Sequence, residues 1–79
     1  MPTFELYKVD VEQNLTSTGH RLEFASVDPS KEQVMKAIFE KYGYGTQYLS
    51  YFSIKKSKDI DVHYGSLSNC HWWTLKKID

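Results

Sequence analysis

The chain has 79 residues, which is enough for one domain, and we expect residues 1–79 to form a single one. Its formal net charge at pH 7 is zero, which argues against a dedicated nucleic-acid-binding protein held mainly by phosphate contacts. Aromatic residues make up 15% of the chain, more than one small core needs, so we expect some at the surface or in an interface.

The single cysteine, Cys70, cannot form an internal disulfide, which fits a reducing cytoplasm. The N-terminus lacks the basic segment and apolar run of a secretory signal, and no apolar stretch is long enough to cross a membrane. We therefore expect a cytoplasmic protein without a membrane partner. The charge is uneven, because residues 1–28 are acidic and residues 29–58 are basic, and such a surface can orient a charged partner.

The chain begins with two alternating segments, residues 4–13 and 20–27, separated by a polar loop. This period of two is typical of half-buried strands, and the short connection predicts an antiparallel hairpin. In the second segment we expect Leu22 and Phe24 to point inward. In the first, the alternation predicts an inward face of Tyr7, Val9 and Val11, while Phe4 and Leu6 fall on the polar face, which indicates partial cover of that face or a bulge.

Residues 28–45 contain the one convincing helix pattern. We expect Asp28 to cap its first turn, Pro29 to occupy its first position and Gly43 to end it in a left-handed conformation. Four apolar residues recur at helical spacing and predict a stripe that packs on the sheet: Val34, Ala37, Ile38 and Tyr42.

Three further strands are predicted at residues 47–56, 60–64 and 70–78. The order is ββαβββ, and we expect an α+β fold in which one helix packs on one face of an antiparallel sheet. The opposite face is then uncovered and carries Tyr51, Lys55, His63 and one of the two tryptophans. A register slip of one residue exchanges the faces, so both assignments of the tryptophans are open. An uncovered face and a spare strand edge would also allow a homodimer.

The sequence contains no assembled catalytic or metal site. Cys70 and His71 are neighbours on a predicted strand, so their side chains point to opposite faces and cannot pair directly. Together with His20 and His63 they lack metal-ligand spacing. The glycines of residues 43–45 follow a helix, whereas phosphate-binding loops precede one. We therefore expect no cofactor and no metal, and a protein that is not an enzyme.

Two groups of lysines near predicted strand ends are candidate binding residues: Lys55, Lys56 and Lys58, and Lys76 with Lys77. Sheet aromatics such as Tyr51 flanked by lysines can stack on bases and hold phosphates, as in small RNA- or DNA-binding domains. Tyr and Trp also anchor protein interfaces. Zero net charge and the acidic first hairpin favour the protein interface and leave nucleic acid as a secondary partner.

The chain has a layout that combines residues 6–15 and 20–26, the lysine-bearing helix, and a closing strand pair with residues 62–64, Trp72 and Trp73. This layout resembles the type I-F anti-CRISPR proteins, small phage-borne inhibitors of CRISPR defence. The chain departs from them in its greater length and in the aromatic residues 43–51. The layout is also similar to a small ribosomal L18a-type domain, whose strongly basic charge the chain lacks.

The anti-CRISPR resemblance implies a stoichiometric inhibitor that binds the crRNA-carrying surveillance complex in the host cytoplasm. Such proteins bind the backbone subunits of that complex and block target DNA from pairing with the guide. By matching position the resemblance implies contacts through lysines of the helix and of the last strand: Lys31, Lys36, Lys41, Lys76 and Lys77.

Overall fold

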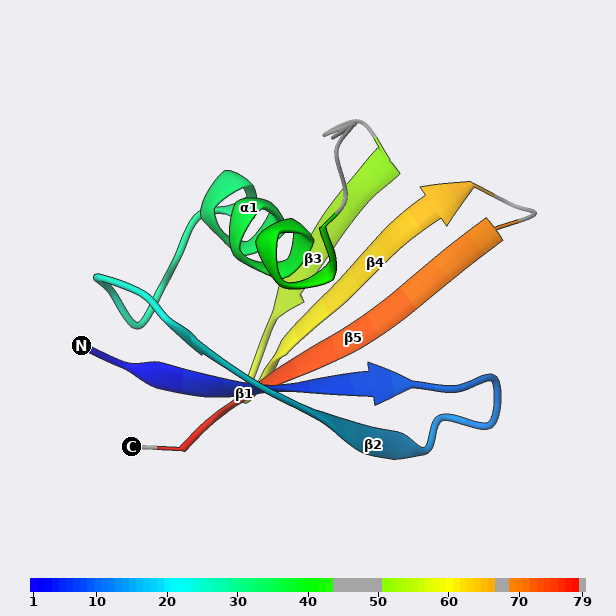
Figure 1. Ribbon diagram of the computed structural model, residues 1–79, viewed down its shortest axis with the longest axis horizontal. Coiled ribbons are helices and arrows are strands. Elements are labelled where there is room, and N and C mark those ends of the chain that lie inside the picture. Colours follow the sequence, from blue (N-terminus) through cyan, green and yellow to red (C-terminus); the bar gives the residue numbers. More distant parts are fainter. Residues whose placement is uncertain (44–50, 67–68, 79) are drawn as a thin grey trace.

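The computed structural model describes residues 1–43, 51–66 and 69–78. In these ranges the chain forms five strands and one helix in the order ββαβββ, which confirms the predicted α+β fold (Figure 1). No helix among the described residues is long and apolar enough to cross a membrane. The elements are β1 (Thr3–Val9), β2 (Leu15–Glu23), α1 (Lys31–Tyr42), β3 (Phe52–Lys56), β4 (Ile60–Ser66) and β5 (Asn69–Lys77).

The strands form one antiparallel sheet in the order β2-β1-β5-β4-β3. The predicted β1–β2 hairpin is confirmed, and the last strand lies at the centre, between β1 and β4. Helix α1 lies on one side of this sheet (Figure 1). The predicted third strand began at residue 47, but residues 44–50 lie outside the described ranges, and β3 begins at Phe52.

The prediction for the inward face of β1 was wrong. Phe4 and Leu6 are the buried residues, whereas Tyr7 and Val9 lie on the opposite face and Val11 is 99% exposed beyond the end of the strand. The reason is the pairing: Phe4 lies opposite Leu22, and Leu6 lies opposite Leu75, so these apolar side chains stack under the helix. The prediction that Leu22 and Phe24 are buried is confirmed.

A bulge interrupts the pairing of β1 with β2. Glu5 lies opposite Arg21 and Tyr7 lies opposite Ser17, so extra residues of β2 face Leu6. Gly19 has a φ of 79° in this stretch, and the Thr18 hydroxyl donates to the Leu6 carbonyl at 2.7 Å. Such a bulge bends the strand that contains it and blunts the sheet edge.

The helix begins two residues later than the sequence predicted. Ser30 is the N-cap and forms a capping box with Gln33, because each side chain accepts from the other's backbone N–H (3.1 and 2.8 Å). Asp28 instead forms an ion pair with Lys56 on β3, and Pro29 is buried just before the cap. The predicted end is confirmed, since Gly43 has a φ of 69° and its N–H donates to the Phe39 carbonyl.

The buried face of α1 is broader than the predicted stripe. Val34 and Ile38 are buried as expected, but Met35 and Phe39 are buried as well, and Tyr42 is 37% exposed at the end of the helix. Phe39 packs edge-on against Tyr64 on β4 and Phe52 on β3, with ring centroids 4.7 and 5.9 Å apart. These contacts place the core between α1 and the sheet.

The two adjacent tryptophans face opposite sides of β5. Trp73 is 1% exposed and its indole N–H donates to the Tyr42 hydroxyl at 3.3 Å, so it lies under the helix. Trp72 is 50% exposed on the face that the helix does not cover. The register between β4 and β5, in which Trp73 lies opposite Val62 and Trp72 opposite His63, determines this assignment.

Candidate binding groove on the open face of the sheet

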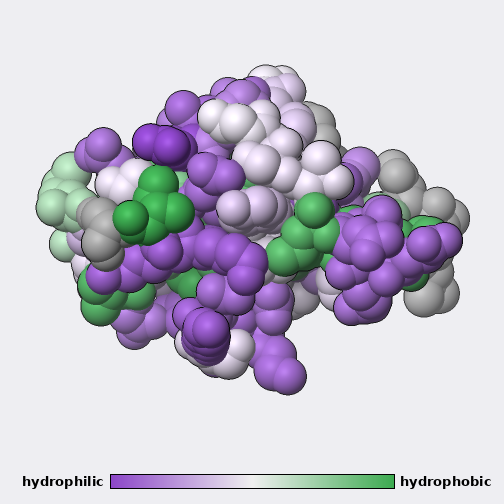
Figure 2. All heavy atoms as spheres, turned by 90° about the horizontal axis from the view of Figure 1, so that it is seen from below, coloured by the Kyte–Doolittle hydropathy of each residue, from purple (hydrophilic) through white to green (hydrophobic). Residues whose placement is uncertain are grey.

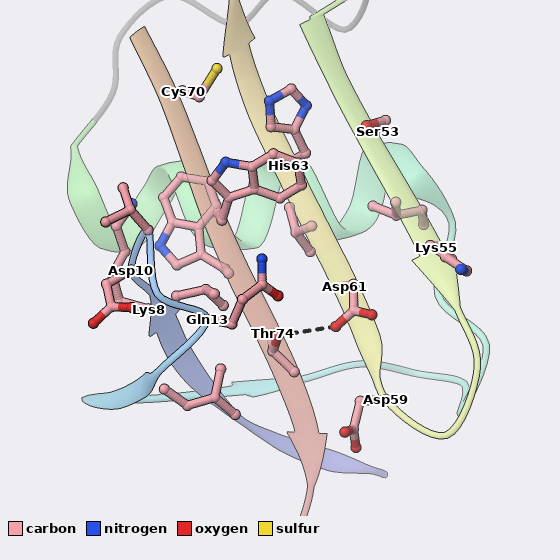
Figure 3. A pocket seen from close by; sticks show the side chains of 17 residues that line it. Lys8, Asp10, Gln13, Ser53, Lys55, Asp59, Asp61, His63, Cys70 and Thr74 are labelled. Atoms are coloured by element: carbon pink, nitrogen blue, oxygen red, sulfur yellow. Dashed lines mark hydrogen bonds between the residues drawn. The ribbon is translucent and has the colours of Figure 1, made fainter.

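The open face of the sheet forms a groove of about 1000 Å³. Its lining comes from β3, β4 and β5 and from the end of β1 with the loop that leads into β2. In Figure 3 the helix lies behind the sheet and the groove is in front of it. The open face carries Lys55, His63 and one tryptophan, as the sequence predicted.

An aromatic stack forms the floor of the groove. Trp72 lies opposite His63 across β5 and β4, and their ring centroids are 4.1 Å apart at an angle of 34°. Half of Trp72 is exposed, while the Nε2 atom of His63 is buried and has no hydrogen-bond partner among the described residues. The stack holds Trp72 in place, because the imidazole supports one side of the indole. The sequence predicted both residues on this face but not their contact.

Polar residues surround this stack. The Thr74 hydroxyl donates to the Asp61 carboxylate at 3.0 Å, as the dashed line in Figure 3 shows. Lys76 forms an ion pair with Asp59 at 3.1 Å. Asp61 is exposed and forms no ion pair within the part of the chain that the structure describes. Neither aspartate was singled out from the sequence as a binding residue.

The loop between β1 and β2 forms one wall of the groove and is ordered by Asp10. The Oδ1 atom of Asp10 accepts from the backbone N–H groups of Glu12 and Asn14, each at 2.9 Å. Gln13 has a positive φ of 69°, and its N–H donates to the Asp10 carbonyl at 3.0 Å. These bonds hold a short, polar loop against the open face, with the Gln13 side chain over the sheet (Figure 3).

Exposed hydrophobic residues of the molecule occur in separate patches. Seen from below the view of Figure 1, the molecule is mostly hydrophilic, with hydrophobic residues in separate patches (Figure 2). Among the groove residues, Trp72 is half exposed and Leu15 is 41% exposed. A few exposed apolar residues surrounded by polar ones are typical of the interfaces of non-obligate protein complexes.

The candidate lysines do not gather on one surface. Those of the helix lie in the layer opposite the groove, Lys55 lies on the groove face of β3, and Lys76 contacts the groove residue Asp59. Two are ion-paired, Lys56 with Asp28 and Lys76 with Asp59. Tyr51, 53% exposed, precedes β3. The remaining candidates are on the helix, in the β3–β4 turn and near the end of β5: Lys31, Lys36, Lys41, Lys58 and Lys77.

A second cluster lies on the helix side of the sheet. The Nζ atom of Lys8 is 4.5 Å from the centre of the Trp73 ring and 3.4 Å from Nδ1 of His71, which stacks on Trp73 and on Tyr64. Burial lowers the pKa of Lys8, and burial together with the Lys8 charge lowers the pKa of His71. A neutral His71 can therefore accept a hydrogen bond from the ammonium. No signal for this cluster is present in the sequence, because Lys8 comes from β1 whereas His71 and Trp73 come from β5.

Cys70 and His71 lie on opposite faces of β5. Cys70 is exposed and lines the groove, whereas His71 stacks on Trp73 under the helix layer. A direct nucleophile–base pair between them is therefore excluded by geometry. Among the described residues, no three His, Cys, Asp or Glu side chains are grouped so that they could hold a metal ion.

Comparison of the chain with known protein families, with characterised proteins and with solved structures finds no match.

Proposed function

We propose that this chain is a non-enzymatic binding protein that docks on a partner protein through the open face of its sheet. The observation that carries the proposal is Trp72, half exposed at the floor of the groove and supported from one side by His63. A rigid, exposed tryptophan in a concave site is the residue type that most often dominates the binding energy of protein interfaces.

The charges of the groove favour a protein over a nucleic acid. Asp10 and Asp61 line it, and a phosphate backbone would be repelled by their carboxylates. Of the lysines that could compensate, Lys76 is ion-paired with Asp59 and Lys56 with Asp28. Net charge of zero is in keeping with a protein partner.

The resemblance to type I-F anti-CRISPR proteins gives this partner a specific identity in our proposal. The chain would act in the host cytoplasm as an inhibitor of a crRNA-guided surveillance complex and would block hybridisation of target DNA. The helix lysines Lys31, Lys36 and Lys41 lie in the layer opposite the groove. They would provide a second contact surface, so that the inhibitor could bridge two elements of a large complex.

A target-DNA binding assay tests this identity. A type I-F surveillance complex is incubated with excess protein, and its binding to a labelled target duplex is followed by electrophoretic mobility shift. We expect the complex to lose DNA binding in proportion to the added inhibitor, up to a fixed stoichiometry. Unimpaired DNA binding at saturating protein would rule out the anti-CRISPR proposal.

The second candidate function is a small RNA- or DNA-binding domain. It is favoured by the exposed Trp72 with Lys55 on the same sheet face, because an aromatic ring and a nearby cation can hold a stacked base and its phosphate. Binding would then fall steeply with salt, and the triple variant Lys55→Ala, Lys56→Ala, Lys58→Ala would abolish it. We expect instead no salt-dependent binding of naked single-stranded DNA or RNA.

A further inference from the structure

We propose that the groove recognises a cationic side chain of its protein partner, an arginine whose guanidinium group lies on Trp72 and is bound by the surrounding carboxylates. The inference rests on the proposed function and specifies what the open face binds. It is carried by three features of the groove: a half-exposed indole backed by His63, an excess of negative charge, and a polar loop that forms one wall.

The Trp72 indole can accept a cation on one side only. Its other side lies on His63, with the ring centroids 4.1 Å apart. Half of Trp72 remains exposed, and it lines the groove. Tryptophan is the side chain that binds cations most strongly through its ring face, and the attraction increases where water is excluded. The His63 support fixes the ring, so little conformational entropy is lost when a ligand stacks on it.

The charges that face the groove are mainly negative. The groove is lined by Asp10, Asp59 and Asp61 on the acidic side and by Lys8 and Lys55 on the basic side. The Lys8 ammonium is directed to the other face of the sheet, where it lies over Trp73. Lys55 lies directly opposite Asp61 in the β3–β4 register, but its side chain is directed to the outer side of β3 (Figure 3), and the two form no ion pair among the residues that the structure describes.

Two carboxylates of the groove are thus left for a cation. Asp59 is neutralised by Lys76, but neither Asp10 nor Asp61 is in an ion pair among the residues that the structure describes. Asp61 lies opposite Thr74 and is therefore the diagonal neighbour of Trp72 on the open face. Diagonal neighbours are about 7–8 Å apart, which is within reach of one guanidinium that stacks on the ring.

The Gln13 amide adds a third polar group to the same space. It lies above the sheet between Asp10 and Asp61 (Figure 3). Its backbone is held by the Asp10 carbonyl, which accepts the Gln13 N–H at 3.0 Å. The carbonyl oxygen of a glutamine side chain can accept a hydrogen bond from a guanidinium while the carboxylate of Asp61 accepts another.

Arginine fits this arrangement better than lysine. Its guanidinium is planar, is more weakly hydrated than an ammonium, stacks on aromatic rings and directs five N–H donors outward in its plane. Proteins that hold nucleic acid use arginine for phosphate contacts. If the groove binds such an arginine, that arginine can no longer contact the phosphates of the partner's nucleic acid. Docking would then inhibit the partner directly.

The direct test uses N-acetyl-arginine amide as the probe and the intact chain labelled with ¹⁵N. The indole N–H signals of the two tryptophans are followed by NMR during titration, and the Trp72→Phe variant assigns them. We expect the Trp72 signal to shift and saturate, while the signal of Trp73, whose N–H is bound to Tyr42, stays in place. N-acetyl-citrulline amide, which has the same shape without the charge, is expected to bind at least about tenfold more weakly.

Matched variants locate the contact. Asp61→Asn keeps the shape of the side chain and is expected to weaken arginine binding about tenfold, whereas Glu23→Gln, on β2 and outside the groove, is expected to leave it unchanged. Equal binding of arginine and citrulline, or no effect of Asp61→Asn, would overturn the proposal. So would a Trp72 shift caused by single-stranded oligonucleotide, or by protein concentration alone, which would indicate a second copy of the chain.

The result is separable from the proposed function. If Trp72→Ala removes binding to the partner complex but free arginine leaves the Trp72 signal unchanged, docking through the open face stands and the arginine inference fails. If arginine binds in the groove and the complex does not bind the protein at all, the inference about the groove stands and the proposed partner is wrong.

Discussion

At the scale of single residues, the two tryptophans show that a shift of one position along a strand separates a residue that stabilises the core from one that is exposed for binding. Trp73 is fully buried beneath α1 and is hydrogen-bonded to Tyr42, whereas Trp72 is half exposed over His63. They are chemically identical and adjacent, so only the register of β5 against β4 separates their roles. A pair of substitutions can therefore test which of the two tryptophans faces the helix.

We expect Trp73→Ala to reduce the free energy of unfolding by about 3–5 kcal/mol, because it removes a large buried ring and leaves a cavity. Trp72→Ala is expected to cost less, about 1–2 kcal/mol, because half of the residue is already exposed and no cavity is left in the core. Urea denaturation followed by circular dichroism gives both values. Equal losses for the two variants would show that the assignment of faces is wrong.

The cluster of Lys8, His71 and Trp73 predicts a pH dependence of stability. Burial and the Lys8 charge lower the pKa of His71 in the folded protein from its ordinary value of about 6.5. Below that pH the unfolded chain takes up a proton at this site more readily than the folded one. The free energy of unfolding should thus fall as the pH decreases from about 6.5 towards the lowered pKa.

Denaturation curves at several values between pH 8 and pH 5 measure this effect. The His71→Gln variant is expected to show a smaller fall than the wild-type protein, because it has no proton to take up at this position. His20→Gln, which removes a histidine on β2 outside the cluster, serves as the control and should retain the fall. A His71→Gln curve parallel to that of the wild type would contradict the role of the cluster.

At the scale of elements, the helix shows why sequence signals place an element better than its first residue. Both Asp28 and Ser30 are good N-cap residues, and Pro29 fits the first helical position after Asp28. The structure selects Ser30, because Gln33 can complete a capping box with it, and Asp28 is used for the ion pair with Lys56.

The two capping residues give a prediction with an internal control. Ser30→Ala should destabilise the protein by about 1 kcal/mol, because it leaves the Gln33 N–H without its acceptor. Asp28→Ala removes only a surface ion pair, in which the Asp28 side chain is 72% exposed, and should cost less. The free energies of unfolding of both variants, measured by urea denaturation, show which of the two residues caps the helix. A larger loss for Asp28→Ala would restore Asp28 as the cap.

The strands show a complementary error. The alternation of apolar and polar residues predicted β1 and β2 correctly. It assigned the wrong inward face to β1, because Val9 and Val11 extend the apolar alternation on the face opposite Phe4 and Leu6. The strand ends at Val9, so Val11 never enters the sheet, and the neighbours of Leu6 across the sheet decide which face is buried. Those neighbours come from β5, at the other end of the chain, and local pattern cannot supply them.

At the scale of the whole molecule, element order and fold class followed from the sequence because each element carries its own periodicity. The candidate site was only partly predictable. The uncovered face with Lys55 and His63 followed from having one helix and alternating strands, whereas the stack of His63 on Trp72 and the place of Gln13 depend on pairings between distant segments. The lysines were identified by local density, yet ion pairs between distant segments neutralise two of them.

The affinity of a type I-F surveillance complex for the wild-type protein and for Trp72→Ala decides whether the open face is the docking surface. The control is Val27→Ala, which truncates a residue that is 65% exposed and does not line the groove. If Trp72 anchors the interface, its loss should weaken binding by about 2 kcal/mol, or roughly 30-fold, while Val27→Ala binds like the wild type and all three proteins are equally folded. Wild-type affinity of a folded Trp72→Ala variant would contradict the proposal that the open face is the docking surface.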